Sequence, residues 1–233
     1  MWMLNGVYEM ITVAIPVGPF PGCVKWLDEA IDSCLQQTPA VGEILLIDDM
    51  AGLPDNYRGC TTYKTPWRIG PAAAFNFGVA LAKYERVIML GSDDKLLPGC
   101  IDICNKAYTK NKEQDAYYWF NIVYNDGEEQ GAACNAAMVT KGLWCFNGGF
   151  PVESACGAMD SILISIMLKN DGKAGWFFHI MGPPIYWVRR HPEQDTAYRG
   201  PWQGVIFSTR NILTEIWTKP EWPNFNAKEY LTH

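Results

Sequence analysis

Residues 11–17, Ile-Thr-Val-Ala-Ile-Pro-Val, form a continuous apolar run that ends at a proline–glycine loop. Such a run is typical of a strand that is buried on both faces of a parallel sheet. Two similar runs follow, EILLI at residues 43–47 and RVIML at residues 86–90, and residues 24–37 and 71–83 between them have helical character. This order predicts an α/β fold, with a mostly parallel sheet flanked by helices on both faces.

After Gly99 the order of predicted elements changes. A helix is expected at residues 101–110, and strands are expected at residues 116–124 and 132–139. A further helix is expected at about residues 157–169. No repeat or low-complexity linker separates the two parts. We therefore expect one domain over residues 1–233, made of two halves that meet near residue 99.

Composition narrows the class of protein. The net charge is −6 and 48% of the 233 residues are hydrophobic, so a large core is expected and broad coating of nucleic acid is not. The eight cysteines include no close C-x-x-C pair, and no secretory leader is evident. No apolar run reaches the roughly 20 residues of a membrane span. We expect a cytoplasmic protein with reduced thiols and no transmembrane segment.

Acidic residues follow two of the predicted strands. Asp48 and Asp49 end the second strand, and Asp93 and Asp94 follow the third. Ligands of open α/β sheets bind at the carboxyl ends of the strands, where neighbouring carboxylates repel one another unless a cation or a hydrogen-bond donor joins them. Hard oxygen ligands suit Mg²⁺ or Mn²⁺. The alternative is that these aspartates only cap the helices that follow them.

Five segments together resemble the family-2 glycosyltransferases, which have the A-type, Rossmann-like, nucleotide-sugar-binding fold. The segments are TVAIPVG, SCLQQTP, EILLIDDMAG, GPAAAFNFGVALA and MLGSDDKLLPG, and the likeness extends over roughly residues 10–195. The resemblance implies a half that binds the nucleotide sugar at about residues 10–99 and an acceptor-binding half at about residues 100–233.

The resemblance also implies a set of donor-binding residues. An aspartate of the first acidic pair binds the uracil edge in such enzymes, so Asp48 or Asp49 is the candidate here. Asp93 matches the second, metal-contacting member of the D-x-D motif, whose first aspartate is replaced by Gly91. Phe75 stands where an arginine commonly precedes the family's asparagine, so another cation must meet the diphosphate. The remaining expected donor contacts are Pro16, Arg68, Asn76 and Ser92.

The segment NGGFPVESACGAMDSILISIML, at residues 147–168, resembles the glycine-rich loop and helix that carry the family's catalytic base. The register places Asp160 at the base, which would take the proton of an acceptor hydroxyl. Asp160 could instead be a helix N-terminal acid that the helix dipole favours. Glu153 is the reserve base and, with Trp144, an expected acceptor contact.

VRRHPEQDT, at residues 188–196, resembles the tyrosine-arginine-x-histidine segment near the end of many family members, with Val188 in place of the tyrosine. By this likeness His191 completes the metal or diphosphate site. Arg189 and Arg190 would neutralise phosphate charge.

The expected reaction is therefore an inverting, metal-dependent sugar transfer from a UDP-sugar, with Mn²⁺ or Mg²⁺ as cofactor. The expected acceptor is a saccharide of the cell envelope. A hydroxymethylated DNA base is the alternative acceptor, because several cations lie in the second half: Lys141, Arg189, Arg190, Arg199 and Arg210. A non-catalytic nucleotide-sugar-binding module is a further alternative, since Gly91 removes an aspartate. A nucleotidyltransferase ranks last, because no glycine-rich basic loop follows the first strand.

Overall fold

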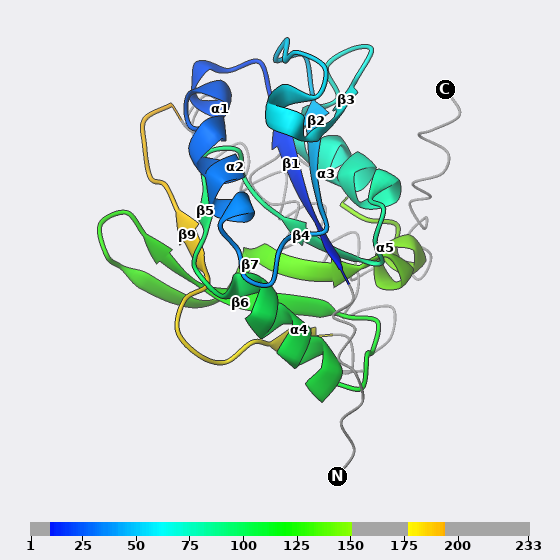
Figure 1. Ribbon diagram of the computed structural model, residues 1–233, viewed down its shortest axis with the longest axis vertical. Coiled ribbons are helices and arrows are strands. Elements are labelled where there is room, and N and C mark those ends of the chain that lie inside the picture. Colours follow the sequence, from blue (N-terminus) through cyan, green and yellow to red (C-terminus); the bar gives the residue numbers. More distant parts are fainter. Residues whose placement is uncertain (1–9, 151–176, 194–233) are drawn as a thin grey trace, which may run out of the picture.

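The structure is a computed structural model that describes residues 10–150 and 177–193, apart from the side chains of residues 132–135. Within these residues nine strands form one sheet in the order β3-β2-β1-β4-β7-β6-β9-β5, with β8 beside β6. Helices cover both faces of the sheet (Figure 1). The predicted α/β class, with helices on both faces, is confirmed.

Four strands of the first half run parallel to one another. They are β1 (Ile11–Val17), β2 (Glu43–Asp48), β3 (Thr61–Lys64) and β4 (Arg86–Met89). β1 lies between β2 and β4, and Val17 pairs with Asp48 at the carboxyl end. Parallel pairing brings the carboxyl ends of these four strands to the same edge of the sheet. The three strands expected from apolar runs are therefore confirmed.

The helices of the described residues divide between the two faces of β1. Its residues alternate, so that Ile11, Val13, Ile15 and Val17 face one helical layer and Ala14 faces the other. The first layer is α1 (Pro21–Lys25), α2 (Leu27–Leu35) and α4 (Cys100–Lys110), and the second is α3 (Gly70–Leu81) with α5 (Lys141–Asn147). The single helix expected at residues 24–37 is instead two helices, because Trp26 leaves helical geometry at φ −113° and ψ 5°.

The second half makes the sheet mixed rather than purely parallel. The expected mostly parallel sheet is confirmed, because five of the eight strand pairings among the described residues are parallel. β7 (Glu129–Thr140) is antiparallel to both β4 and β6 (Tyr117–Tyr124). The physical reason is a tight hairpin between β6 and β7, closed by a hydrogen bond from the Tyr124 N–H to the Glu128 carbonyl. Strands joined by such a turn can only pair antiparallel.

Several short elements were not predicted. They are β3, the 3-10 helix Tyr57–Gly59, β5 (Lys95–Leu96), α5, β8 (Phe177–His179) and β9 (Tyr186–Val188). Each strand among them has two to four residues, which is too short for a hydrophobic period to be measured. Their pairing partners in the sheet decide their conformation.

Helix α3 approaches the sheet closely at Gly78. A Cβ atom added at Gly78 would lie 2.8 Å from the Cβ atom of Ala14 on β1. Carbon atoms at that separation repel one another, since their contact distance is about 3.5–4.0 Å. The glycine therefore lets the helix lie against the strand that organises the first half.

We predict that Gly78→Ala lowers the free energy of unfolding by about 1–2 kcal/mol. Alanine favours helix by about 1 kcal/mol, but overpacking of about 1–3 kcal/mol outweighs that gain. The same change should cost clearly less in an Ala14→Gly background, where the opposing methyl group is gone. Thermal or denaturant unfolding of the four members of this cycle measures the difference. An equal cost in both backgrounds would contradict the proposed contact.

Candidate active site

A pocket of about 640 Å³, part of it open to solvent, lies where β1, β2 and β4 end. Its walls come from the loop after β1, from α1, from the start of α3 and from the loop after β4. The residues that line it are Pro16, Gly18, Pro19, Phe20, Cys23, Asp49, Arg68, Pro71, Ala74, Phe75, Gly91, Asp93 and Glu193. Four of the predicted site residues are among them: Pro16, Asp49, Arg68 and Asp93.

The two aspartates at the end of β2 have different surroundings. The carboxylate of Asp48 accepts hydrogen bonds from the N–H groups of Ala51, Gly52 and Leu53, at 2.6–3.1 Å, and so holds its own loop. Asp49 accepts hydrogen bonds from the N–H groups of Ile69 and Gly70, at 2.6 and 2.8 Å, at the start of α3. Because Asp49 lines the pocket, it is the member of the pair that a ligand can reach.

Arg68 is the sole cationic side chain among the described residues that line the pocket. Its guanidinium carbon lies 4.7 Å from the ring centre of Phe20, so the arginine lies over an aromatic face. The segment that carries it is anchored, because Thr65 on one side and Ile69 on the other both donate hydrogen bonds to Asp49. Arg68 therefore reaches the pocket from a loop that hydrogen bonds to Asp49 hold in place.

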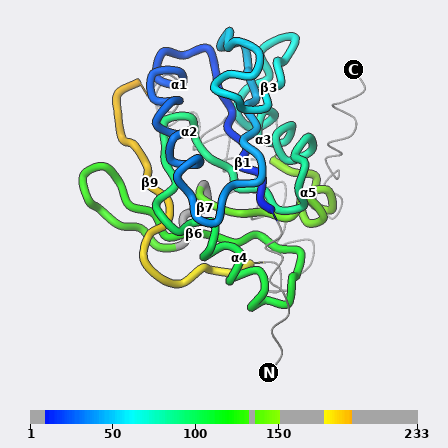
Figure 2. The backbone as a smooth tube through the Cα atoms, in the orientation of Figure 1, coloured from blue at the N-terminus to red at the C-terminus, as the bar shows by residue number. Residues whose placement is uncertain are grey.

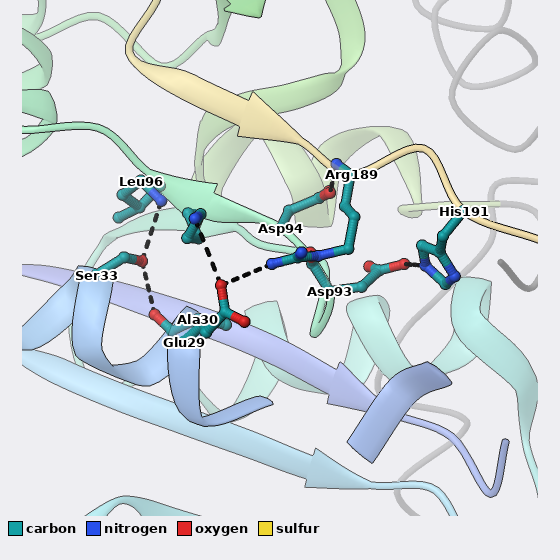
Figure 3. Close-up of polar contacts among 9 residues, drawn as sticks. Glu29, Ala30, Ser33, Asp93, Asp94, Leu96, Arg189 and His191 are labelled. Carbon is teal, nitrogen blue, oxygen red and sulfur yellow. Dashed lines mark hydrogen bonds and ion pairs between the residues drawn. The ribbon is translucent and has the colours of Figure 1, made fainter. Parts of the chain in front are cut away.

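Asp93 and His191 come together across nearly 100 residues of sequence. The Nε2 atom of His191 lies 2.9 Å from Oδ2 of Asp93, as Figure 3 shows. The Nδ1 atom of His191 is buried and has no hydrogen-bond partner among the described residues. Segment 191–193 packs tightly against α1, because a Cβ at Gly22 would lie 2.6 Å from the Glu193 carbonyl oxygen (Figure 2).

A side chain at Gly91 would be crowded by the two acids that follow it. A Cβ atom there would lie 2.7 Å from Oδ2 of Asp94 and 3.0 Å from Oδ1 of Asp93. A turn in which the Asp94 N–H donates to the Gly91 carbonyl brings these groups together. A third carboxylate at this position would meet both a collision and the repulsion of two like charges.

Asp94 is buried behind the pocket in a network that sequence reasoning missed. Tyr186 donates its hydroxyl hydrogen to Asp94 at 3.0 Å and accepts a hydrogen bond from the Gly91 N–H. The Arg189 N–H also donates to Asp94, at 3.0 Å. Burial, followed by the charge of Asp93, raises the pKa of Asp94 to about 8.

Neither Arg189 nor Arg190 lines the pocket, in contrast to the expected phosphate contacts. Arg189 is ion-paired with Glu29 of α2 at 2.7 Å. Arg190 is ion-paired with Asp126 and Glu128 of the β6–β7 hairpin, at 2.8 and 2.6 Å. In this conformation the acidic partners already neutralise both guanidinium groups. Sequence spacing placed them near the site but could not reveal those partners.

Asn76 and Trp144 are buried and hydrogen-bonded to each other. Asn76 is buried and holds the Gly-Gly-Phe loop, because it accepts from the Phe150 N–H and donates to the Phe150 carbonyl, both at 2.8 Å. Trp144 is only 2% exposed and donates its indole N–H to Asn76 at 3.2 Å. The Trp144 ring is packed inside the core of the described residues, and its contact with an acceptor stays a prediction. Ser92 is buried in the turn after β4.

Two predicted residues, Asp160 and Glu153, lie outside the described residues. Phe20 and Glu193 are among the pocket residues that the sequence did not single out. The available signal for Glu193 was its place two residues after His191. Phe20 had no sequence signal beyond its position in the loop after the first strand. No helix of the described part is long and apolar enough to cross a membrane.

Comparisons with known proteins agree with this geometry. Residues 19–134 match the sequence profile described as glycosyl transferase family 2. No curated protein matches the chain in sequence. The structure of S. aureus TarS residues 1–349 in complex with UDP-GlcNAc is similar, with a TM-score of 0.69 and 14% identity. That match covers 91% of this chain and 68% of the TarS fragment.

Two other TarS structures from S. aureus are also similar. The fragment 1–349 in complex with UDP has a TM-score of 0.63 and 13% identity, over 95% of this chain and 69% of that one. A longer TarS structure has a TM-score of 0.65 and 16% identity over 91% of this chain, which spans 40% of its length. At these identities the structures establish the fold, and the profile match establishes the family. The chain belongs to the family-2 glycosyltransferases and has their A-type fold.

Proposed function

We propose that this glycosyltransferase transfers a sugar from a UDP-sugar to an acceptor hydroxyl, with inversion at the anomeric carbon and with a divalent cation. The observation that carries the proposal is the pocket at the ends of β1, β2 and β4, which presents Asp49, Arg68 and Asp93 together. The family and the TarS complexes with UDP and UDP-GlcNAc support the nucleotide class. UDP-GlcNAc is the first donor to test.

The charge of the pocket supports a requirement for a cation. Among the described residues that line it, the acids Asp49, Asp93 and Glu193 outnumber the single cation Arg68. A diphosphate carries at least two negative charges, so its approach to this lining is opposed unless a further positive charge is present. A Mn²⁺ or Mg²⁺ ion bound with the donor supplies that charge.

The residues present suit such an ion as partial ligands. Asp93 has a side chain 25% exposed, and the adjacent imidazole of His191 has a buried nitrogen without a described partner. Within the described ranges, no three His, Cys, Asp or Glu side chains lie close enough together to hold a metal alone. Diphosphate and water oxygens would therefore complete the coordination. When bound, the ion would stabilise the negative charge of the departing diphosphate.

The remaining roles follow from chemistry and from family resemblance. Asp49 is the carboxylate that accepts a hydrogen bond from the uracil edge, because it lines the pocket and Asp48 does not. Arg68 offsets diphosphate charge from the exposed side of the pocket. Asp160 is the base that takes the acceptor proton, with Glu153 in reserve. Pro16 provides an apolar wall beside the nucleotide.

For the acceptor we propose a saccharide hydroxyl. Three of the five cations that favoured DNA are engaged within the chain: Lys141 donates to the Ala82 carbonyl, and Arg189 and Arg190 are ion-paired. Arg199 and Arg210 lie outside the described residues. A non-catalytic nucleotide-sugar-binding module is the second candidate, favoured by Gly91. UDP release from UDP-GlcNAc with Mn²⁺, measured with saccharides and with hydroxymethylated DNA, separates the three possibilities.

Arg68→Ala should weaken UDP binding about tenfold, because a hydrogen bond to a charged group contributes about 1.5–3 kcal/mol. Arg58→Ala is the matched control, since Arg58 is ion-paired with Asp32 on the outer side of α2. Fluorescence or calorimetric titration with UDP measures both variants. Equal affinities for the two variants would show that the diphosphate does not lie near Arg68.

Asp93→Asn should abolish the increase in UDP affinity that Mn²⁺ produces, while UDP affinity in EDTA stays within about twofold of the unmodified chain. The amide keeps the size of the side chain but loses the charge that a divalent cation requires. Titrations with UDP in Mn²⁺ and in EDTA provide the measurement. A variant that keeps the full Mn²⁺ effect would exclude Asp93 as a ligand.

Asp160→Asn should lower sugar transfer by about 10² or more, because the amide cannot accept a proton at neutral pH. Asparagine still caps a helix, so melting temperature and UDP affinity should hardly change. The three quantities are measured on one preparation. Near-normal transfer would refute the assignment and make Glu153→Gln the next variant.

A further inference from the structure

The guanidinium of Arg189 joins segments that are far apart in the sequence. Its Nη2 atom donates to Oε2 of Glu29 on α2, at 2.7 Å, and its Nε atom donates to the carbonyl of Asp93, at 3.0 Å. The backbone N–H of Arg189 donates to the carboxyl of Asp94. Figure 3 shows these groups between α2 and the loop that leads to His191.

Two tryptophans hold the plane of this guanidinium. Its central carbon lies 4.8 Å from the ring centre of Trp26 and 4.7 Å from that of Trp187. Trp26 also packs against the imidazole of His191, with ring centres 4.2 Å apart. The planar guanidinium stacks on aromatic rings and donates hydrogen bonds in two directions. A lysine ammonium group cannot reproduce this arrangement.

Glu29 is the acidic end of this arrangement. Partial desolvation raises the pKa of Glu29, but hydrogen bonds and charges of Arg189 and Lys95 outweigh it and hold the pKa below its ordinary value. The carboxylate is about half exposed, with 49% of its side chain accessible. Exposed pairs contribute little to overall stability. The effect of this pair is therefore expected in the placement of the groups it joins.

We propose that Arg189 and Glu29 form a positioning lock that holds the Asp93 loop against α2 and sets Asp93 and His191 at their observed separation. The lock rests on the proposed function, in which Asp93 and His191 face the cation and the diphosphate. Arg189 acts through Asp93 and does not itself contact the donor. Residues that hold metal ligands in place without touching the metal commonly change metal affinity by about 10–100-fold when they are removed.

The chain offers a closely matched control for Glu29. Asp32 lies one turn further along α2, is 48% exposed and is paired with Arg58 at 2.6 Å. Glu29→Gln and Asp32→Asn therefore each remove one half-exposed acid of α2 that binds an arginine. The two changes differ in whether that arginine contacts the Asp93 loop. Arg189→Lys tests the same lock from its other end.

Titration with UDP in Mn²⁺ and in EDTA, together with melting temperatures, tests the proposal on the full chain. Glu29→Gln and Arg189→Lys should reduce the Mn²⁺-dependent gain in UDP affinity about tenfold. UDP affinity in EDTA should stay within about twofold, and the melting temperature should fall by less than about 3 °C. Asp32→Asn should match the unmodified chain throughout. A general structural role would instead lower stability and both affinities together.

The sign of the Glu29→Gln effect separates the lock from direct contact. If Arg189 reached the diphosphate, loss of Glu29 would release it and UDP affinity in EDTA would be raised, which would overturn the proposal. Identical Mn²⁺ effects in Glu29→Gln and Asp32→Asn would overturn it as well.

Hydrogen–deuterium exchange of residues 90–97 tests the lock separately from the proposed function. Exchange should be faster in Glu29→Gln and Arg189→Lys than in Asp32→Asn, and equal exchange would contradict the lock. If the unmodified chain did not bind UDP at all, the proposed function would fail, while this exchange measurement would still decide whether the lock exists.

Discussion

The burial of β1 on both faces is the constraint on which the rest of the structure depends. Its side chains alternate between two helical layers, and every residue from Ile11 to Ile15 is fully buried. This strand has a parallel neighbour on each side, β2 and β4. The carboxyl ends of three strands therefore lie side by side, and the acidic residues that follow β2 and β4 meet at one pocket.

The carboxylates at that edge repel one another, and several groups reduce the repulsion. Asp48 accepts hydrogen bonds from the N–H groups of its own loop, and Asp49 accepts them from the N–H groups at the start of α3. Asp94 is buried, and burial and the neighbouring Asp93 raise its pKa. Asp93 is left as the carboxyl of the β4 loop that reaches the pocket. One charged ligand in that loop is what a site shared with a diphosphate requires.

Much of the polar network around the pocket supports the site without facing the ligand. Asn76 holds the Phe150 loop, Tyr186 holds the turn at Gly91, and Arg189 joins this turn to α2. Buried polar groups of this kind have defined partners, so they fix the positions of the groups beside them. This explains how a chain that lacks one motif aspartate can still hold its remaining acid in place.

The sequence by itself determined the strand–helix order of the first half, the acidic ends of β2 and β4, and the pairing of Asp93 with His191 through the family's motifs. These features depend on local periodicity and on motif residues, which are visible in a single chain. The mixed sheet, the short strands and the partners of Arg189, Arg190 and Trp144 were decided only by the tertiary structure. Each depends on contacts between residues far apart in sequence, such as Arg189 with Glu29. Local propensity carries no information about such partners, because their energy arises only when packing brings the two segments together.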